Sequence, residues 1–160
     1  MPVTPEIKTI ASKKIVGLHI TTSSANNTTP AMWRQFMPRR KEITNTISDE
    51  LISMQVFDTS IPFADFDANT PFTNWAAVEV NSFNDVPLGM ETHTIQGGKY
   101  AVYMYKGDLK KYFETRQYIM FTWLPQNGYQ LDDREYFEIL DERYKNGHPE
   151  SEEEVWIPIK

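Results

Sequence analysis

Apolar and polar side chains alternate in several short segments of this chain, a period typical of strands with one buried face. The same segments are rich in β-branched and aromatic residues, which favours strands over helices. They predict strands at 14–22, 51–57, 75–80, 136–141 and 154–159, and a strand pair divided by Gly97 and Gly98.

Two longer segments between these strands predict helices. Thr29 and Pro30 supply an N-cap and an N1 proline for a helix over about 30–43, which Pro38 should kink or shorten. A second helix is predicted over about 108–123. Each half of the chain therefore has the order strand, helix, strand, strand (βαββ).

The two halves also share local patterns. The run from Phe36 to Pro38 matches Trp123 to Pro125, and Met54 to Asp58 matches Phe137 to Asp141, at similar offsets of 125 − 38 = 87 and 141 − 58 = 83 residues. A duplication explains this similarity. We therefore predict one α+β domain over 1–160, built from tandem βαββ repeats at about 5–81 and 90–160.

Strand alternation divides the predicted sheets into two faces. One face is apolar and should pack beneath the helices; in the last two strands it comprises Phe137, Ile139, Val155, Ile157 and Ile159. The opposite face carries the other phase of the strands: Tyr136, Glu138, Leu140 and Trp156, with Tyr103, Tyr105, Trp75, Ala77, His19 and Gln55.

This second face has the composition of a ligand groove. Aromatic rings offer flat contact area and attract cations, and a carboxylate among them adds a charged anchor. The alternative is that these rings cover a loop or a partner subunit. The candidate ligand-binding residues are Glu138, Trp75, Tyr103, Tyr105, Tyr136, Trp156 and His19, together with Phe36 of the first helix.

Composition narrows the possible partners. The formal net charge is −6 and the longest basic run is Arg39 to Lys41, so direct nucleic-acid binding is not expected. With no cysteine, the chain has no thiol nucleophile, disulfide or cysteine zinc site. The first 14 residues lack a signal-like apolar run and no segment reaches membrane-spanning length, which predicts a cytoplasmic protein without membrane contact.

No motif indicates a metal or cofactor. The three histidines, His19, His93 and His148, lack metal-ligand spacing. The stretch Asp65–Asn69 begins like a calcium loop but has Thr70 where that loop needs glycine. The acidic run Glu150–Glu154 is interpreted as a solvated loop that discourages edge pairing.

The order of several motifs resembles the GyrI-like, or AraC-type effector-binding, domain, over nearly the whole chain. In the second half the resemblance rests on Gly97–Gly107, Gln117–Tyr129, Phe137–Tyr144 and Ile157–Lys160. In the first half it rests on Lys14–Leu18, Trp33–Phe36 and Ala77–Val80.

The resemblance implies tandem βαββ repeats with pseudo-two-fold symmetry, antiparallel sheets and a ligand groove between the repeats. It also implies that Glu138, the glutamate of the Phe-Glu-x-x-Asp-Glu-Arg motif, meets a cationic, aromatic or amphipathic ligand. Gln55 is its counterpart in the first repeat. Regulators of this family carry a helix-turn-helix segment, for which this chain has neither the length nor the basic face, so we expect a stand-alone member.

Three functions follow, and small-molecule binding or sensing is favoured. The second is hydrolysis of an electrophilic small molecule, with Glu138 activating water and Tyr103 or Tyr105 polarising the leaving group. The third is interaction with a protein partner, either a regulator or a topoisomerase such as gyrase, which the acidic charge permits but no motif specifies.

Overall fold

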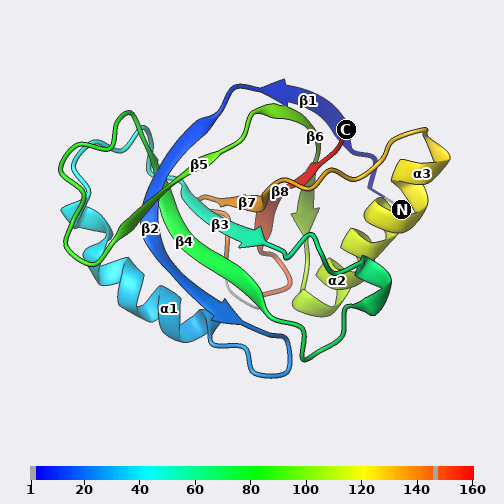
Figure 1. The fold of residues 1–160 in the computed structure, drawn as a ribbon, viewed down its shortest axis with the longest axis horizontal. Coiled ribbons are helices and arrows are strands. Elements are labelled where there is room, and N and C mark those ends of the chain that lie inside the picture. Colours follow the sequence, from blue (N-terminus) through cyan, green and yellow to red (C-terminus); the bar gives the residue numbers. More distant parts are fainter. Residues whose placement is uncertain (1–2, 146–147) are drawn as a thin grey trace. The chain divides into compact units, whose positions relative to one another are not determined.

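The computed structural model describes residues 3–145 and 148–160 and divides into two compact units (Figure 1). The N-terminal unit is Lys13–Ile95. The C-terminal unit combines the chain up to Ser12 with Gln96–Lys160. Both units contain antiparallel strands and helices, which confirms the predicted α+β class.

The N-terminal unit has four strands in the order β3-β4-β2-β5, and each neighbouring pair is antiparallel. Its helix packs on one face of this sheet, over a core that includes Val16, Val78 and Phe36. The elements are β2 (Lys13–Thr22), α1 (Thr29–Phe36), the 3₁₀ helices η1 (Met37–Glu42) and η2 (Phe63–Asp65), β3 (Leu51–Val56), β4 (Phe72–Val80) and β5 (Glu91–Ile95).

Pro38 shortens the first helix as predicted. The α-helical part ends at Phe36, and residues 37–42 continue as a 3₁₀ helix. Proline has no N–H to donate to the preceding turn, and its ring collides with the carbonyl four residues earlier, so regular α-helical geometry stops near it. The tighter 3₁₀ turn carries the chain to Ile43, which is buried in the same core.

The C-terminal unit also has four strands, in the antiparallel order β1-β6-β8-β7. The Asp108 side chain caps its main helix by accepting a hydrogen bond from the Lys111 N–H at 3.0 Å. The elements are β1 (Glu6–Ile10), β6 (Gly98–Lys106), α2 (Leu109–Tyr118), the π-helix η3 (Ile119–Trp123), α3 (Leu124–Gln126), β7 (Tyr136–Leu140) and β8 (Glu152–Pro158).

The first strand of each half pairs within the unit formed mainly by the other half. Strand β1 pairs with β6, and β5 pairs with β2. Gly97 and Gly98 therefore separate two strands of different units, and the strands predicted on either side of them do not pair with each other. A Cβ atom on Gly97 would lie 2.7 Å from the Ile10 carbonyl oxygen, so the chain needs glycine where it passes the end of β1.

Among the helices that the structure describes, none is both long enough and apolar enough to cross a membrane. The longest of them, α2, has 10 residues. The one side chain of α2 that is buried is a tyrosine, Tyr112. Tyr112 is part of the candidate site.

Candidate functional site

The pairing of β7 with β8 assigns the side chains of the C-terminal unit to its two faces. Phe137 lies opposite Trp156, and Glu138 lies opposite Val155. Directly opposed residues of an antiparallel pair share a face. Phe137 and Trp156 accordingly stack, with ring centroids 5.2 Å apart and an interplanar angle of 13°. The prediction that Trp156 shares a face with Glu138 is wrong, because the phase assumed for β7 relative to β8 was shifted by one residue.

The face that carries Glu138 lies beneath helix α2. The Tyr112 hydroxyl of α2 donates a hydrogen bond to the Glu138 carboxylate. One turn further along the helix, the Arg116 guanidinium lies 5.3 Å from the centre of the Tyr136 ring. The predicted arrangement, with Phe137 beneath the helices and Glu138 on the far face, is therefore wrong. The polar partners on α2 make a carboxylate tolerable there, and strand alternation contains no information about them.

Two predicted tyrosines of β6 share this face. Tyr103 lies opposite Val155 and Tyr105 lies opposite Glu153 on β8. The structure thus brings Glu138 together with three predicted residues and with two that sequence reasoning missed, Tyr112 and Arg116. We call this set, with Glu153, the Glu138 cluster: Glu138, Tyr103, Tyr105, Tyr136, Tyr112, Arg116 and Glu153.

The acidic run near the C-terminus contributes to this cluster. Residues 152–154 lie in β8, which has β6 on one side and β7 on the other. The interpretation of the run as a solvated loop at a sheet edge is therefore wrong. Glu154 lies opposite Ile139 and accepts a hydrogen bond from the Trp156 indole N–H at 2.6 Å, whereas Glu153 points toward the Glu138 side.

Burial and mutual repulsion govern the charges of the Glu138 cluster. Burial raises the pKa of the Glu138 carboxyl, and the Arg116 guanidinium and the Tyr112 hydroxyl oppose this rise. Burial, followed by repulsion from Glu138, raises the pKa of Glu153 to about 8, and Arg116 again opposes the rise. Burial also raises the pKa of the Tyr112 hydroxyl well above its usual value. The two carboxyls therefore share one guanidinium, and at pH 7 one of them tends to keep its proton.

The Tyr103 hydroxyl is a buried polar group in the same cluster. The side chain is only 3% exposed, and its hydroxyl has no hydrogen-bond partner among the described residues. Burial raises the pKa of this hydroxyl, so it stays a neutral donor near pH 7. An orphaned buried hydroxyl is costly in a folded protein and points to a missing partner such as a water molecule or a ligand.

A small cavity opens beside the cluster, between the start of α2 and strands β6 and β8. Its volume is about 60 Å³. Its described wall includes three tyrosines and two acidic residues, Asp108 and Glu153. The lining residues are Tyr105, Gly107, Asp108, Leu109, Tyr112, Tyr144, Ser151 and Glu153.

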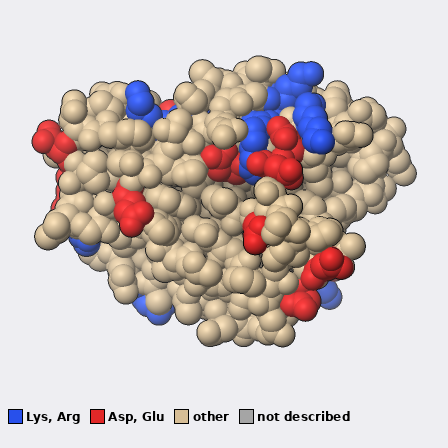
Figure 2. All heavy atoms as spheres, viewed as in Figure 1, with Lys and Arg blue, Asp and Glu red and all other residues tan. Residues whose placement is uncertain are grey.

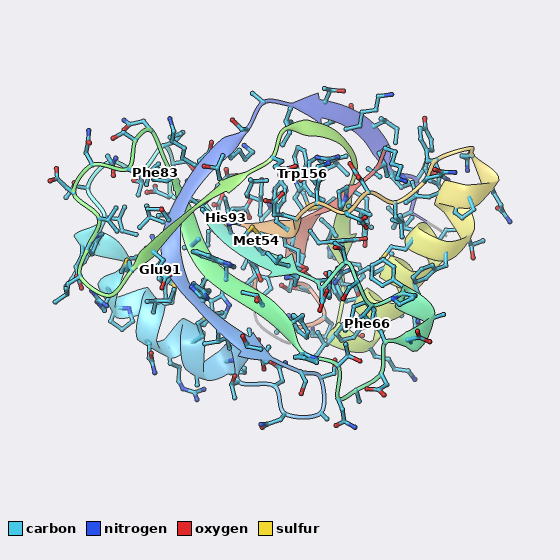
Figure 3. The ribbon with its side chains drawn as sticks, in the orientation of Figure 1. Met54, Phe66, Phe83, Glu91, His93 and Trp156 are labelled. Atoms are coloured by element: carbon cyan, nitrogen blue, oxygen red, sulfur yellow. The ribbon has the colours of Figure 1, made fainter. Side chains whose placement is uncertain are left out.

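The other predicted residues lie in the N-terminal unit. Trp75 lies opposite both His19 and Met54, on the face turned away from the α1 core, and the His19 and Trp75 rings are 4.5 Å apart. His19 Nε2 also lies 2.7 Å from a Glu91 carboxylate oxygen. Figure 3 labels Met54 on β3, and Glu91 and His93 on β5. A second aromatic and acidic patch therefore exists within this unit.

Two predictions for the N-terminal unit need correction. Gln55 lies opposite Asn74, whose side-chain amide donates to the Thr29 hydroxyl at 2.8 Å, so Gln55 is on the α1 side and does not share the face of Trp75. Phe36 is 0% exposed in the core beneath α1, where its ring meets the edge of Trp33. Its ring is a core element that a ligand cannot reach in this structure.

The geometry does not favour the hydrolase alternative. Glu138 is hydrogen-bonded by Tyr112, and not by Tyr103 or Tyr105. The Tyr105 hydroxyl donates to the Asp108 carbonyl oxygen at 2.5 Å, so it is already engaged.

The surface charge bears on nucleic-acid binding. On the face drawn in Figure 2, the basic and acidic side chains of the described residues are interspersed and form no continuous basic surface.

Comparisons with known proteins agree on the family. The model of the GyrI-like small-molecule-binding domain matches residues 4–160. The transcriptional regulator BrlR of Pseudomonas aeruginosa is 28% identical over 146 residues, which are 91% of this chain and 51% of BrlR. The chain thus spans about half the length of this curated relative.

Two solved structures have the same fold. The C-terminal domain of EcmrR has a TM-score of 0.72 and 15% identity, over 100% of this chain and 99% of that domain. SAV2435, solved bound to tetraphenylphosphonium, has a TM-score of 0.69 and 15% identity, over 98% of this chain and 93% of that one. Since the family model covers nearly every residue, this chain belongs to the GyrI-like small-molecule-binding domain family.

Proposed function

We propose that this chain binds organic cations at the Glu138 cluster, with Glu138 as the principal anionic anchor. The observation that carries the proposal is a carboxylate held beneath a helix, among tyrosine rings and beside the buried Tyr103 hydroxyl, which has no hydrogen-bond partner in the part of the chain that the structure describes. A plain core would not contain this combination, because each buried polar group costs free energy unless it is paired.

Cation binding is favoured because it costs free energy to keep the Glu138 carboxylate ionised in its buried position. Burial raises its pKa, and Arg116 and Tyr112 only partly offset that effect. A cation that enters among the rings gains attraction from the carboxylate and from the faces of the tyrosines, and both terms strengthen as water leaves. Tyr103 can donate its free hydroxyl to a polar atom of the same ligand.

The relatives support this ligand class. SAV2435 has been solved with tetraphenylphosphonium, a bulky aromatic cation. BrlR is a transcriptional regulator, and the EcmrR chain in a DNA complex is longer than this domain, which covers 57% of it. We infer that this chain senses effectors in the manner of a regulator's effector-binding domain.

The test is the affinity of the purified protein for tetraphenylphosphonium before and after Glu138→Gln. We expect the dissociation constant to rise about tenfold or more, because the amide keeps the shape but loses the charge. Calorimetry or quenching of tryptophan fluorescence gives the constant. Glu142→Gln, an exposed carboxylate changed in the same way, is the matched control and should bind like the wild type. Equal affinity of all three proteins would exclude the anchor role.

A further inference from the structure

The small cavity beside the Glu138 cluster has a wall that the backbone holds open. Gly107 has a φ of +145°, and a Cβ atom there would lie 2.6 Å from the Tyr105 hydroxyl. That hydroxyl is fixed by its hydrogen bond to the Asp108 carbonyl, and the Gly107 N–H donates to the Ser151 carbonyl at 3.1 Å. Glycine and these hydrogen bonds together keep the space free of side chains.

The rings around the cavity are arranged as they are in sites for small cations. Tyr105 and Tyr112 meet edge to face, with centroids 5.4 Å apart at 84°, so they form two walls at right angles. Tyr144 supplies a third ring, and the Glu153 carboxyl closes the set. Aromatic walls around a carboxyl group are the usual means of binding ammonium groups.

The volume limits what can enter. About 60 Å³ has room for a protonated amine and the first carbon atoms of its chain, since roughly 10–15 Å³ of such space is enough for one water molecule. A bulky aromatic cation does not fit there. The cavity therefore selects the cationic end of a ligand whose apolar part lies elsewhere.

The charges around Glu153 determine what happens when a cation arrives. With Glu138 ionised and Arg116 charged, the cluster is neutral as long as Glu153 keeps its proton. A cation beside Glu153 favours the ionised carboxylate, so it displaces that proton. The titratable or charged groups around Glu153 come from β6, the residue before α2, α2 itself, β7 and the segment after β7: Tyr103, Tyr105, Asp108, Tyr112, Arg116, Glu138 and Tyr144.

We propose that this cavity is a subsite for the protonated amine of an amphipathic alkylammonium ligand, and that binding of the amine releases the proton of Glu153. The inference rests on the proposed function and refines its ligand class. Glu138 remains the anchor for a bulky cation such as tetraphenylphosphonium, and Glu153 takes up the charge of an amine that enters the cavity. Binding and proton release are then coupled in this domain.

The experiment measures binding of 2-phenylethylammonium to the wild type and to Glu153→Gln between pH 6 and pH 8. Because Glu153 titrates at about 8, the wild-type affinity should rise about tenfold per pH unit up to that value. Calorimetry in two buffers with different ionisation enthalpies should show release of nearly one proton at pH 6. Glu153→Gln should bind with an affinity independent of pH and release no proton, and Glu153→Asp should restore the release.

A second measurement reports on Glu153 without a ligand. A carboxyl whose pKa is higher in the folded protein than in the unfolded chain contributes stability at low pH that is lost as pH rises through the folded value. The wild-type protein should therefore lose stability as the pH increases from about 5 to 8, more than Glu153→Gln does. Urea unfolding at several pH values measures this difference.

The outcomes separate the two proposals. Binding of 2-phenylethylammonium without a pH slope or proton release overturns the role of Glu153, and it leaves organic-cation binding at Glu138 intact if Glu138→Gln still weakens tetraphenylphosphonium. Failure of the wild type to bind either cation overturns both proposals. Parallel stability profiles for the wild type and Glu153→Gln also overturn the inference, because Glu153 would then not hold a proton in the folded state.

Discussion

Arg116→Leu should lower the free energy of unfolding by about 2–4 kcal/mol at pH 7, because it removes the only guanidinium that offsets two carboxyls beneath α2 among the described residues. Removing one partner of a buried pair leaves the other charge uncompensated. The loss should shrink in acid, since Glu138 then binds a proton and its charge disappears. Urea unfolding followed by tryptophan fluorescence measures both effects.

Two further variants isolate the electrostatic part of this loss. Adding Glu138→Leu to Arg116→Leu should restore much of the stability, because no unpaired charge is left in the cluster. Arg143→Leu breaks an exposed pair with Asp141, in which the arginine side chain is 46% exposed, and should cost less than about 1 kcal/mol. A double variant as unstable as Arg116→Leu alone would show that packing of the arginine stem, and not its charge, is responsible.

Phe36→Ala should destabilise the protein by about 3–5 kcal/mol, because this ring is fully buried in the core beneath α1 and its loss leaves a cavity. Phe36→Leu keeps most of the volume and should cost less than about 1.5 kcal/mol. Thermal or urea unfolding of the three proteins gives the differences.

The same pair of variants separates a core role from the predicted ligand role of Phe36. If Phe36 belongs to the core, the folded fraction of Phe36→Leu should bind tetraphenylphosphonium as the wild type does. A large loss of affinity in Phe36→Leu at unchanged stability would return this ring to the binding site. No such contact is expected, because the Phe36 side chain is fully buried in the core beneath α1.

Local signals in the sequence were sufficient to predict most of the fold. Seven of the eight described strands were predicted, five of them with bounds within three residues of those observed. Pro30 and Pro38 predicted the start and the early end of α1, although its N-cap is Thr28 and not Thr29. The short strand β1 was missed, because its alternation is brief and its side chains are mostly exposed. The resemblance to the GyrI-like family, stated from motifs of both halves, is confirmed over residues 4–160.

The faces were harder to assign than the strands. Since side chains alternate with a period of two, a shift of one residue in the phase of β7 placed Glu138 away from α2 and on the same face as Trp156, whereas the phase of β8 was predicted correctly. Only the pairing register fixes that phase, and pairing joins residues that are far apart in sequence. Gln55 was misplaced relative to Trp75 for the same reason.

Tyr112 and Arg116 could have been found from the sequence. They are four residues apart in the predicted second helix, a spacing that places two side chains on one face. The prediction of a helix over about 108–123 assigned none of its side chains to the candidate site. Glu153 was passed over because its run of acidic residues resembled a solvated loop, although residues 152–154 begin β8.

The first strand of each half pairs within the unit formed mainly by the other half, and this pairing affects how the chain folds. Strand β1 pairs with β6, so its partner is synthesised about 90 residues later, and β5 must return to β2 across most of the first half. These pairings close long loops, which slows folding relative to a chain of local hairpins. During synthesis the first strand waits without its partner until the second half emerges, so neither half can complete its sheet by itself.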